Sequence, residues 1–431
     1  MLVMAILLLV ITLLLGLPVP FAFFTSSIWI LLVGGYNYNF LFTHGYNSIG
    51  SIVLLAIPLF IMAGGIMQRG NIAESLISII DLFIGRIKGG LGAVAVVSCA
   101  VFGSITGSSS ATLSCIGSIM FPRLKKSGYP LGHTAALLSS AAVLGMLIPP
   151  STLMILYSWI GGQSVLACFL SGVIPGVMLM LLFSIYNIYI LRNSNIIVDK
   201  RMNFSTFKKL LVRRSFNSFP ALLMPVFVLG GIYGGFITPT EAAAVSVVYA
   251  IPLGFWVYKG LNKESFKETI IESATTTGVI MLMLFGVMML SRLYIMENLP
   301  EKILNFLYTI TNSKNGILFA INIFMIIIGM LMDDCSATLL CTPILLPVII
   351  KMGISPIHFA AILGVNIGMG NVTPPTAPLL YLAGRLNGAS LDQSIKPALQ
   401  LILFCWLPVL FIITYIPSLS LFLPRLILGI K

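Results

Sequence analysis

Two stretches of this sequence gather hydroxyl, carboxylate and glycine residues inside long apolar surroundings. The first reads GSITGSSSATLSC (residues 103–115) and the second reads GMLMDDCSATLLC (residues 329–341). Hydroxyls, backbone carbonyls and a carboxylate are hard oxygen ligands that suit a small cation such as Na⁺. The N–H groups that a helix leaves free at its start suit an anion. We therefore expect these stretches to bind a small cation and an anion.

Each stretch is followed by a pair of prolines, at 149–150 in GMLIPPSTLM and at 374–375 in GNVTPPTAPL. Proline lacks an N–H donor and leaves carbonyl oxygens upstream without a partner. Irregular backbone is tolerated at bilayer depth only when it is buried in protein or lines a watery cavity. We therefore expect re-entrant helical hairpins at 104–126 and 330–351, each accompanied by a Pro-Pro break, which together form two oxygen-rich sites.

The two halves of the chain repeat one another. Gly103 aligns with Gly329 at a shift of 226, and the Pro-Pro pairs align at a shift of 225. A colinear series of such matches predicts two structural repeats, 1–215 and 216–431.

Charge predicts the orientation of the repeats. Arg123, Lys125 and Lys126 follow the first hairpin, whereas only Lys351 occupies the equivalent part of the second. Because basic loops face the cytoplasm, the copies are expected to point in opposite directions across the membrane. Inverted repeats with broken helices are typical of transporters that work by alternating access.

Composition places most of the chain in lipid, since 58% of the 431 residues are hydrophobic and only 8% are charged. The apolar residues come in blocks rather than in strict alternation, which predicts helices and not a barrel. The sequence thus predicts an all-α, polytopic membrane protein with about ten to twelve spans. The apolar runs are 1–15, 21–33, 52–67, 89–103, 131–148, 165–191, 219–235, 241–258, 274–296, 316–332, 356–370 and 399–423.

The net charge of +12 does not indicate a nucleic-acid partner. The cations lie in short loops and in a basic connection at 192–214, which is expected to face the cytoplasm and the headgroups of the lipid bilayer. The six cysteines form no CxxC pair and are interpreted as packing residues.

Asp333 and Asp334 follow an apolar run directly. A carboxylate within the membrane indicates function, whereas an aspartate that caps a helix N-terminus is the plainer alternative. We favour function for Asp333 and leave both interpretations open for Asp334. Asn366 is equally compatible with a ligand and with a contact between helices. Glu241 is expected to cap a helix that begins at Pro239.

Five motifs of the chain resemble those of the large membrane (permease) subunit of TRAP, or tripartite ATP-independent periplasmic, transporters. The motifs are GSITGSSSATLSCIGSIMFPRLKKSGYP, LGMLIPPS, YGGFITPTEAAAVSVVYA, GMLMDDCSATLLCTPILLPV and NIGMGNVTPPTAPL. They occur in the family's order, and the similarity runs from about residue 16 to about residue 400.

The resemblance implies a permease of the bacterial inner membrane that imports organic acids, such as C4-dicarboxylates, sialic acid or other sugar acids. It implies Na⁺ as the coupling ion, no other cofactor, and no enzymatic activity. Two protein partners are implied, a small four-helix membrane subunit and a periplasmic substrate-binding protein. In such an elevator-type transporter, a transport domain that carries both hairpins slides against a scaffold.

The resemblance also implies which residues form the site. Sodium is expected at Gly107, Ser108, Ser110, Pro149, Asp333, Ser336, Thr338, Asn366, Gly370 and Thr373. The acidic substrate is expected between the hairpin tips, at Ser109, Ser151, Cys335 and Thr376.

Two departures from the family pattern affect this pocket. Ser110 replaces the apolar residue of the usual GSSVAT, and Asp334-Cys335 follows the hairpin aspartate where the family is often apolar or hydroxylic. The identity of the substrate therefore cannot be inferred from the substrate of a relative.

A stand-alone sodium–dicarboxylate symporter is the nearest alternative, and uptake of free substrate without a binding protein would favour it. An intramembrane enzyme is less well supported, because the sequence contains no HExxH or other convergent catalytic set. A channel is disfavoured by the repeated breaks at matching positions.

Overall fold

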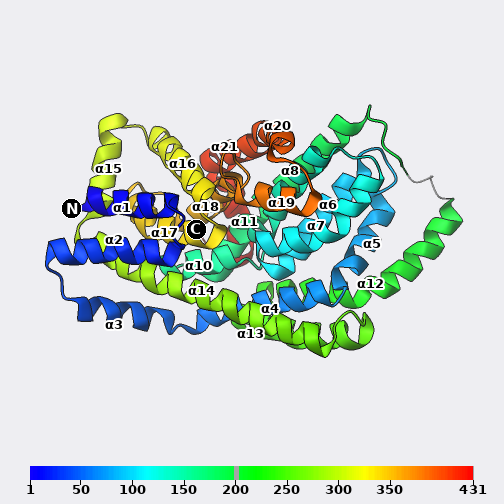
Figure 1. The fold of residues 1–431 in the computed structure, drawn as a ribbon, viewed down its shortest axis with the longest axis horizontal. Coiled ribbons are helices and arrows are strands. Elements are labelled where there is room, and N and C mark those ends of the chain that lie inside the picture. Colours follow the sequence, from blue (N-terminus) through cyan, green and yellow to red (C-terminus); the bar gives the residue numbers. More distant parts are fainter. Residues whose placement is uncertain (199–202, 431) are drawn as a thin grey trace.

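The computed structural model describes residues 1–198 and 203–430, and each regular element in these ranges is a helix (Figure 1). The first elements are α1 (Leu2–Leu14), α2 (Val19–Gly34), α3 (Tyr38–Ile49), η1 (Ile52–Leu55), α4 (Ala56–Arg69), α5 (Ile72–Ile84), α6 (Gly90–Thr106), α7 (Ser109–Lys126), α8 (Leu131–Ala142), α9 (Leu144–Leu147), α10 (Thr152–Gly161) and α11 (Val165–Leu191).

The remaining elements follow the basic connection. They are α12 (Phe204–Tyr233), α13 (Pro239–Pro252), η2 (Leu253–Val257), α14 (Lys263–Met296), α15 (Leu299–Ile310), α16 (Lys314–Leu331), α17 (Asp334–Lys351), α18 (Pro356–Gly370), α19 (Pro378–Asn387), α20 (Leu391–Leu401), η3 (Ile402–Trp406), α21 (Leu407–Tyr415) and α22 (Pro417–Leu428).

Within the described residues, eight helices are long and apolar enough to cross a membrane, or nine if the bent pair Leu131–Leu147 and Thr152–Gly161 forms one span. The expectation of a multi-pass, all-α membrane protein is confirmed. The expected number of about ten to twelve spans is higher than the number of such helices, because several apolar runs fold as shorter helices. Glycine ends two of them, since α2 stops before Gly35 and α6 before Gly107, both at positive φ.

In each half, two helices are joined by a tight turn at the position expected for the hairpin. α6 and α7 turn at Gly107-Ser108, and α16 and α17 turn at Met332-Asp333. The expected hairpin ranges, 104–126 and 330–351, contain the turns and the second arms, whereas the first arms begin further upstream. We call Gly107-Ser108 together with the first turn of α7 the first tip. We call Met332-Asp333 together with the first turn of α17 the second tip.

The elements after each helix pair also correspond. Each pair is followed by an apolar segment, α8–α9 or α18, by a cis Pro-Pro bond, and by a short helix, α10 or α19. The boundary expected after residue 215 falls inside α12, because the charged segment 204–214 continues as helix into the apolar run that follows. The inverted orientation of the repeats stays a prediction.

Glycine pairs allow the first arm of each helix pair to approach the segment before its Pro-Pro bond. A Cβ atom added to Gly103 in α6 would lie 2.3 Å from the Cα of Gly145 in α9. A Cβ added to Gly370 at the end of α18 would lie 2.7 Å from the Cα of Gly329 in α16. Small residues permit such close helix contacts in membrane proteins. Both arms are therefore fixed against the broken segments by backbone contact.

The two halves exchange contacts. α10, which follows the first Pro-Pro bond, packs against α17 of the second helix pair. In the same way α19, which follows the second Pro-Pro bond, packs against α7 of the first. α18 packs against both α16 and α11. The broken segments of both halves consequently meet in one core, which carries the two tips.

Long helices form an outer layer beside this core. α14 contacts α2, α3 and α4 and also reaches α17, while α12 packs against α5 and α13. In Figure 1, α3, α4, α13 and α14 lie along one long edge of the molecule, and α20 and α21 lie along the opposite edge. At the start of α13, Thr238 and Glu241 form a reciprocal capping box, which confirms the role expected for Glu241.

The glycine contacts lead to a stability prediction. Gly103→Ala forces a methyl group into the backbone of α9, and overpacking of this kind costs about 1–3 kcal/mol. We expect a lower thermal unfolding midpoint for the purified protein in detergent. The control is Gly278→Ala, at an exposed position of α14 where an added Cβ meets nothing within 4 Å. That change should leave the midpoint unchanged or raise it, because alanine is the better helix former. An unchanged midpoint for Gly103→Ala would contradict the packing described.

Candidate functional site

Both tips line a single cavity of about 800 Å³. Its walls come from α7, α17 and α19 on the core side and from α2, α4 and α14 on the outer side. The polar residues that line it are Gln68, Thr106, Ser108, Ser109, Ser110, Ser114, Thr152, Glu272, Thr275, Thr276, Asp333, Asp334, Cys335, Ser336 and Asn371. The cavity is therefore large enough for a small organic molecule and rich in oxygen atoms.

The first tip is held by the start of α10. Gly107 has a φ of +64°, which favours glycine, and its carbonyl oxygen accepts hydrogen bonds from the Thr152 backbone N–H at 3.2 Å and hydroxyl at 2.8 Å. The hydroxyls of Ser108 and Ser110 lie 3.2 Å apart, and both residues line the cavity. This part of the tip presents neutral oxygen atoms at the N-terminus of α7.

The second tip begins with an aspartate cap. The carboxylate of Asp333 accepts a hydrogen bond from the backbone N–H of Cys335 at 3.1 Å and another from the hydroxyl of Ser336. The capping interpretation of Asp333 is thus realised, yet the residue is also exposed and lines the cavity. Its carboxylate therefore remains accessible to an ion.

The two tips are joined by Asp334. The Ser109 hydroxyl of the first tip donates to one carboxylate oxygen of Asp334, and the side-chain amide of Asn371 donates to the other. Hydrogen bonds to a charged group typically contribute about 1.5–3 kcal/mol. Sequence reasoning left the role of Asp334 open and did not identify Asn371, although Asn371 stands between the predicted residues Gly370 and Thr373.

The outer wall carries a further carboxylate that the sequence reasoning missed. Glu272, Thr275 and Thr276 follow one another on one face of α14 and line the cavity. Arg69 of α4 pairs with Glu272 at 2.6 Å and also with Glu268. The polar run ESATTT (residues 272–277), which overlaps the start of the apolar stretch 274–296, was the feature of the sequence that could have indicated this wall.

The structure brings only part of the expected site to the cavity. Of the residues expected to bind sodium or substrate, the cavity is lined by Ser108, Ser109, Ser110, Asp333, Cys335 and Ser336. Gly107, Pro149, Ser151, Thr338, Asn366, Gly370, Thr373 and Thr376 do not line it.

Several of the residues away from the cavity have local partners. The hydroxyl of Ser151 donates to Met146 O at 2.5 Å and accepts from Met154 N at the start of α10. The Thr373 hydroxyl donates to the Met369 carbonyl at 2.6 Å. Thr376 donates to the carbonyl oxygen of Met330, so the Pro-Pro loop contacts the first arm of its own helix pair. These side chains stabilise the breaks.

Two buried amides keep an oxygen atom without a hydrogen-bond partner. The Asn366 Nδ2 donates to Asn322 Oδ1 at 3.0 Å and to Ile362 O at 2.8 Å, whereas its Oδ1 accepts no hydrogen bond. The Oδ1 of Asn371 is likewise unpartnered. A buried acceptor without a donor costs about 1–3 kcal/mol. Each of these oxygens would be satisfied by a cation.

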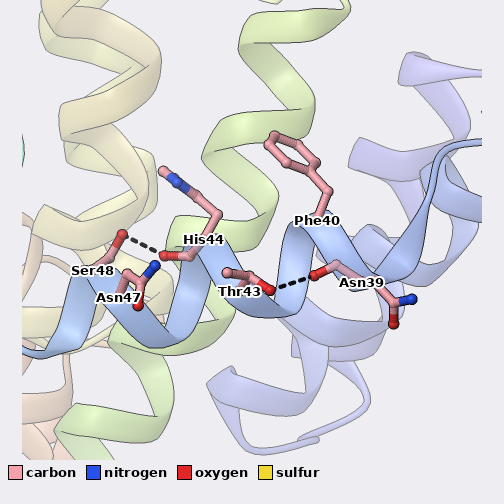
Figure 2. Close-up of a pocket in the computed structure, with 6 residues that line it drawn as sticks. All are labelled: Asn39, Phe40, Thr43, His44, Asn47 and Ser48. Atoms are coloured by element: carbon pink, nitrogen blue, oxygen red, sulfur yellow. Dashed lines mark hydrogen bonds between the residues drawn. The ribbon is translucent and has the colours of Figure 1, made fainter.

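Two other cavities carry none of the expected site residues. Figure 2 shows one of about 560 Å³ on α3, lined by Asn39, Phe40, Thr43, His44, Asn47 and Ser48, whose hydroxyls bond within the helix. The other, of about 420 Å³, lies beside the main cavity and shares Gln68 with it. The described residues contain no group of three or more His, Cys, Asp or Glu side chains that could hold a metal ion.

Residues 4–419 match the family described as "Tripartite ATP-independent periplasmic transporter, DctM component". The chain is 33% identical to an isethionate TRAP transporter permease protein of Oleidesulfovibrio alaskensis, over 91% of this chain and 61% of that protein. It thus spans less than two thirds of that relative. It is 33% identical to a C4-dicarboxylate TRAP transporter large permease protein of Pseudomonas aeruginosa, over 86% of each chain. It is 30% identical to a sialic acid TRAP transporter large permease protein of Vibrio cholerae, over 96% of each.

Solved structures with the same fold are also transporters. The YdaH transporter of Alcanivorax borkumensis has a TM-score of 0.64 and 15% identity, over 87% of this chain and 88% of that chain. MtrF of Neisseria gonorrhoeae has a TM-score of 0.59 and 12% identity, over 86% and 83%. These identities show a shared fold alone. The family match confirms the resemblance found in the motifs. The chain belongs to the DctM family and is the large membrane subunit of a TRAP transporter.

Proposed function

We propose that this chain is the permease of a sodium-coupled importer of an organic acid in the bacterial inner membrane. The observation that carries the proposal is the single cavity that both tips line and that Ser109 and Asp334 bridge. The relatives are named for isethionate, C4-dicarboxylates and sialic acid, all of which are organic acids. A small four-helix membrane subunit and a periplasmic binding protein complete the proposed transporter.

Sodium is proposed to bind at the tips and behind them. Ser108, Ser110 and Ser336 supply hydroxyl oxygens, and Asp333 supplies an exposed carboxylate. Asn366 adds a buried oxygen that has no donor. Such mixed neutral and charged oxygen sets suit a hard monovalent cation. Sodium would thereby hold the tip residues in the arrangement that the substrate requires.

The substrate is proposed to occupy the cavity between the tips. The first turns of α7 and α17 line it, and helix N-termini favour anions. The tips belong to the core, whereas α2, α4 and α14 belong to the outer layer. A substrate site between two such bodies suits an elevator movement of the core against the outer helices.

We propose that sodium and substrate transport are coupled through the stability of the core with different combinations of sodium and substrate bound. The core would move when both sodium and substrate are bound or when both are absent, because partial loading leaves buried polar or charged groups without partners. A stand-alone symporter shares this mechanism and differs in needing no binding protein.

The proposal predicts the outcome of uptake into proteoliposomes. The chain is reconstituted with its small subunit, an inward sodium gradient is imposed, and a panel of radiolabelled organic acids is offered with and without the cognate binding protein. We expect accumulation that requires both sodium and the binding protein. Uptake that requires sodium but not the binding protein would instead support the stand-alone symporter. Uptake that is equally fast without a sodium gradient would contradict sodium coupling.

A carboxylate substitution tests the sodium ligands separately. Asp333→Asn replaces a charged oxygen ligand by a neutral one, so half-maximal uptake should need about tenfold more sodium, equivalent to about 1.4 kcal/mol. The matched control is Asp392→Asn, the same change at an exposed residue in the first turn of α20. It should leave the sodium dependence as in the wild type. An unaltered sodium dependence in Asp333→Asn would remove this residue from the proposed site.

A further inference from the structure

The cavity of the proposed transport site is lined by acidic groups and by no basic ones. Glu272, Asp333 and Asp334 line it, and none of the described lining residues is Lys, Arg or His. This balance is unexpected for a site that takes an anion, since like charges repel strongly where water is partly excluded.

Two of the carboxylates have a source of positive charge. Glu272 pairs with Arg69 at 2.6 Å. Asp333 is exposed at the second tip, where the proposed function places a sodium ion. Asp334 differs, because the side chains that donate hydrogen bonds to it, the hydroxyl of Ser109 and the amide of Asn371, are both neutral. Among the carboxylates that line the cavity, Asp334 is therefore the one without a cationic partner.

The donors around Asp334 are all neutral. The Ser109 hydroxyl and the Asn371 amide each donate to one of its carboxylate oxygens, and the backbone N–H groups of Ser109 and of Asp334 itself also donate to the carboxylate. Asn371 is 1% exposed, lines the cavity, and has an unpartnered Oδ1. A reversed amide would place a carbonyl oxygen against the carboxylate, so the orientation that leaves Oδ1 without a donor is the favourable one. Because its donors are all neutral, Asp334 is suited to a further donor that carries positive charge.

We propose that the transported organic acid also carries a positively charged nitrogen, and that Asp334 binds this nitrogen. The substrate is then a zwitterion, such as an amino carboxylic or amino sulfonic acid, rather than a dianion. Its acid group faces the first turns of α7 and α17, while its positively charged N–H groups donate to the carboxylate of Asp334. The inference rests on the proposed function and specifies the substrate class of the same cavity.

Cys335 provides a test that does not require the substrate to be known. It lines the cavity and is half-buried, whereas the other five cysteines, Cys99, Cys115, Cys168, Cys341 and Cys405, are buried. The complex of the chain with its small subunit is treated in choline chloride with cationic aminoethyl or anionic sulfonatoethyl methanethiosulfonate. Rates at Cys335 are divided by the rates of the same reagents with a free thiol. Cys335→Ser measures the background.

We expect the cationic reagent to react about tenfold faster after this correction, because an acidic cavity concentrates cations. Asp334→Asn should lower the preference several-fold, and Asp334→Ser provides the same test if the amide variant does not fold. Asp392→Asn, outside the cavity, should retain the full preference. Equal rates for both reagents, a preference unaffected by either Asp334 variant, or no labelling of Cys335 would overturn the inference.

A sodium ion could supply the same positive charge at Asp334, so the labelling is repeated in sodium chloride. A preference that persists shows that sodium leaves Asp334 available to the substrate. If the preference disappears in sodium, the coupling ion occupies Asp334 and the inference is overturned.

Matched ligand pairs test the substrate class directly. Thermal unfolding of the same complex in sodium chloride is followed with aspartate or succinate, and with taurine or isethionate. In the first pair an ammonium group replaces a hydrogen atom, and in the second it replaces a hydroxyl group. We expect the amine-bearing member to half-saturate at about tenfold lower concentration, a preference that Asp334→Asn abolishes. If neither acid of a pair binds, the labelling rates of Cys335 decide whether the inference holds. Tighter binding of the amine-free member overturns the inference, and sodium-driven uptake of that acid would leave the proposed function intact.

Discussion

A helix that breaks inside a membrane protein leaves backbone N–H and C=O groups that lipid cannot satisfy, and the fold is organised around this constraint. Residues beside the Pro-Pro bonds donate hydrogen bonds to carbonyl oxygens at or near the turns of the helix pairs. Thr152, beside the first Pro-Pro bond, donates twice to the carbonyl of Gly107, and Thr376, beside the second, donates to that of Met330. Because α10 also packs on α17 and α19 on α7, the breaks of both halves are held in one core.

This arrangement explains why the site lies between the halves of the chain. The tips lie at the N-termini of α7 and α17, and Ser109 and Asp334 bring these two helix ends together. The opposite wall comes from α2, α4 and α14, which belong to the outer layer. A ligand in the cavity would therefore contact both the core and the outer layer.

The sequence predicted those parts of the molecule that depend on local chemistry. The repeated polar motifs located both turns, and the Pro-Pro pairs located both breaks. The sequence TPTE (residues 238–241) located the helix cap at Glu241. Each of these signals lies within a few residues of the chain. The partners of Asp334 could not be found this way. Ser109 lies 225 residues away, and only the packing of the two halves brings it near. The wall residue Glu272 was missed because its pairing with Arg69 requires two helices from different halves. The described residues contain fewer long apolar helices than the sequence has apolar runs, because hydropathy does not show where glycine ends a helix.

The central claim is that sodium and the two tips form one site around the cavity. It is tested most directly by the total labelling rate of Cys335 in sodium chloride and in choline chloride at equal ionic strength. The account predicts slower labelling in sodium by reagents of either charge, because sodium orders the residues of both tips around this cysteine. Equal rates in the two salts, with substrate absent, would contradict a sodium site at the tips.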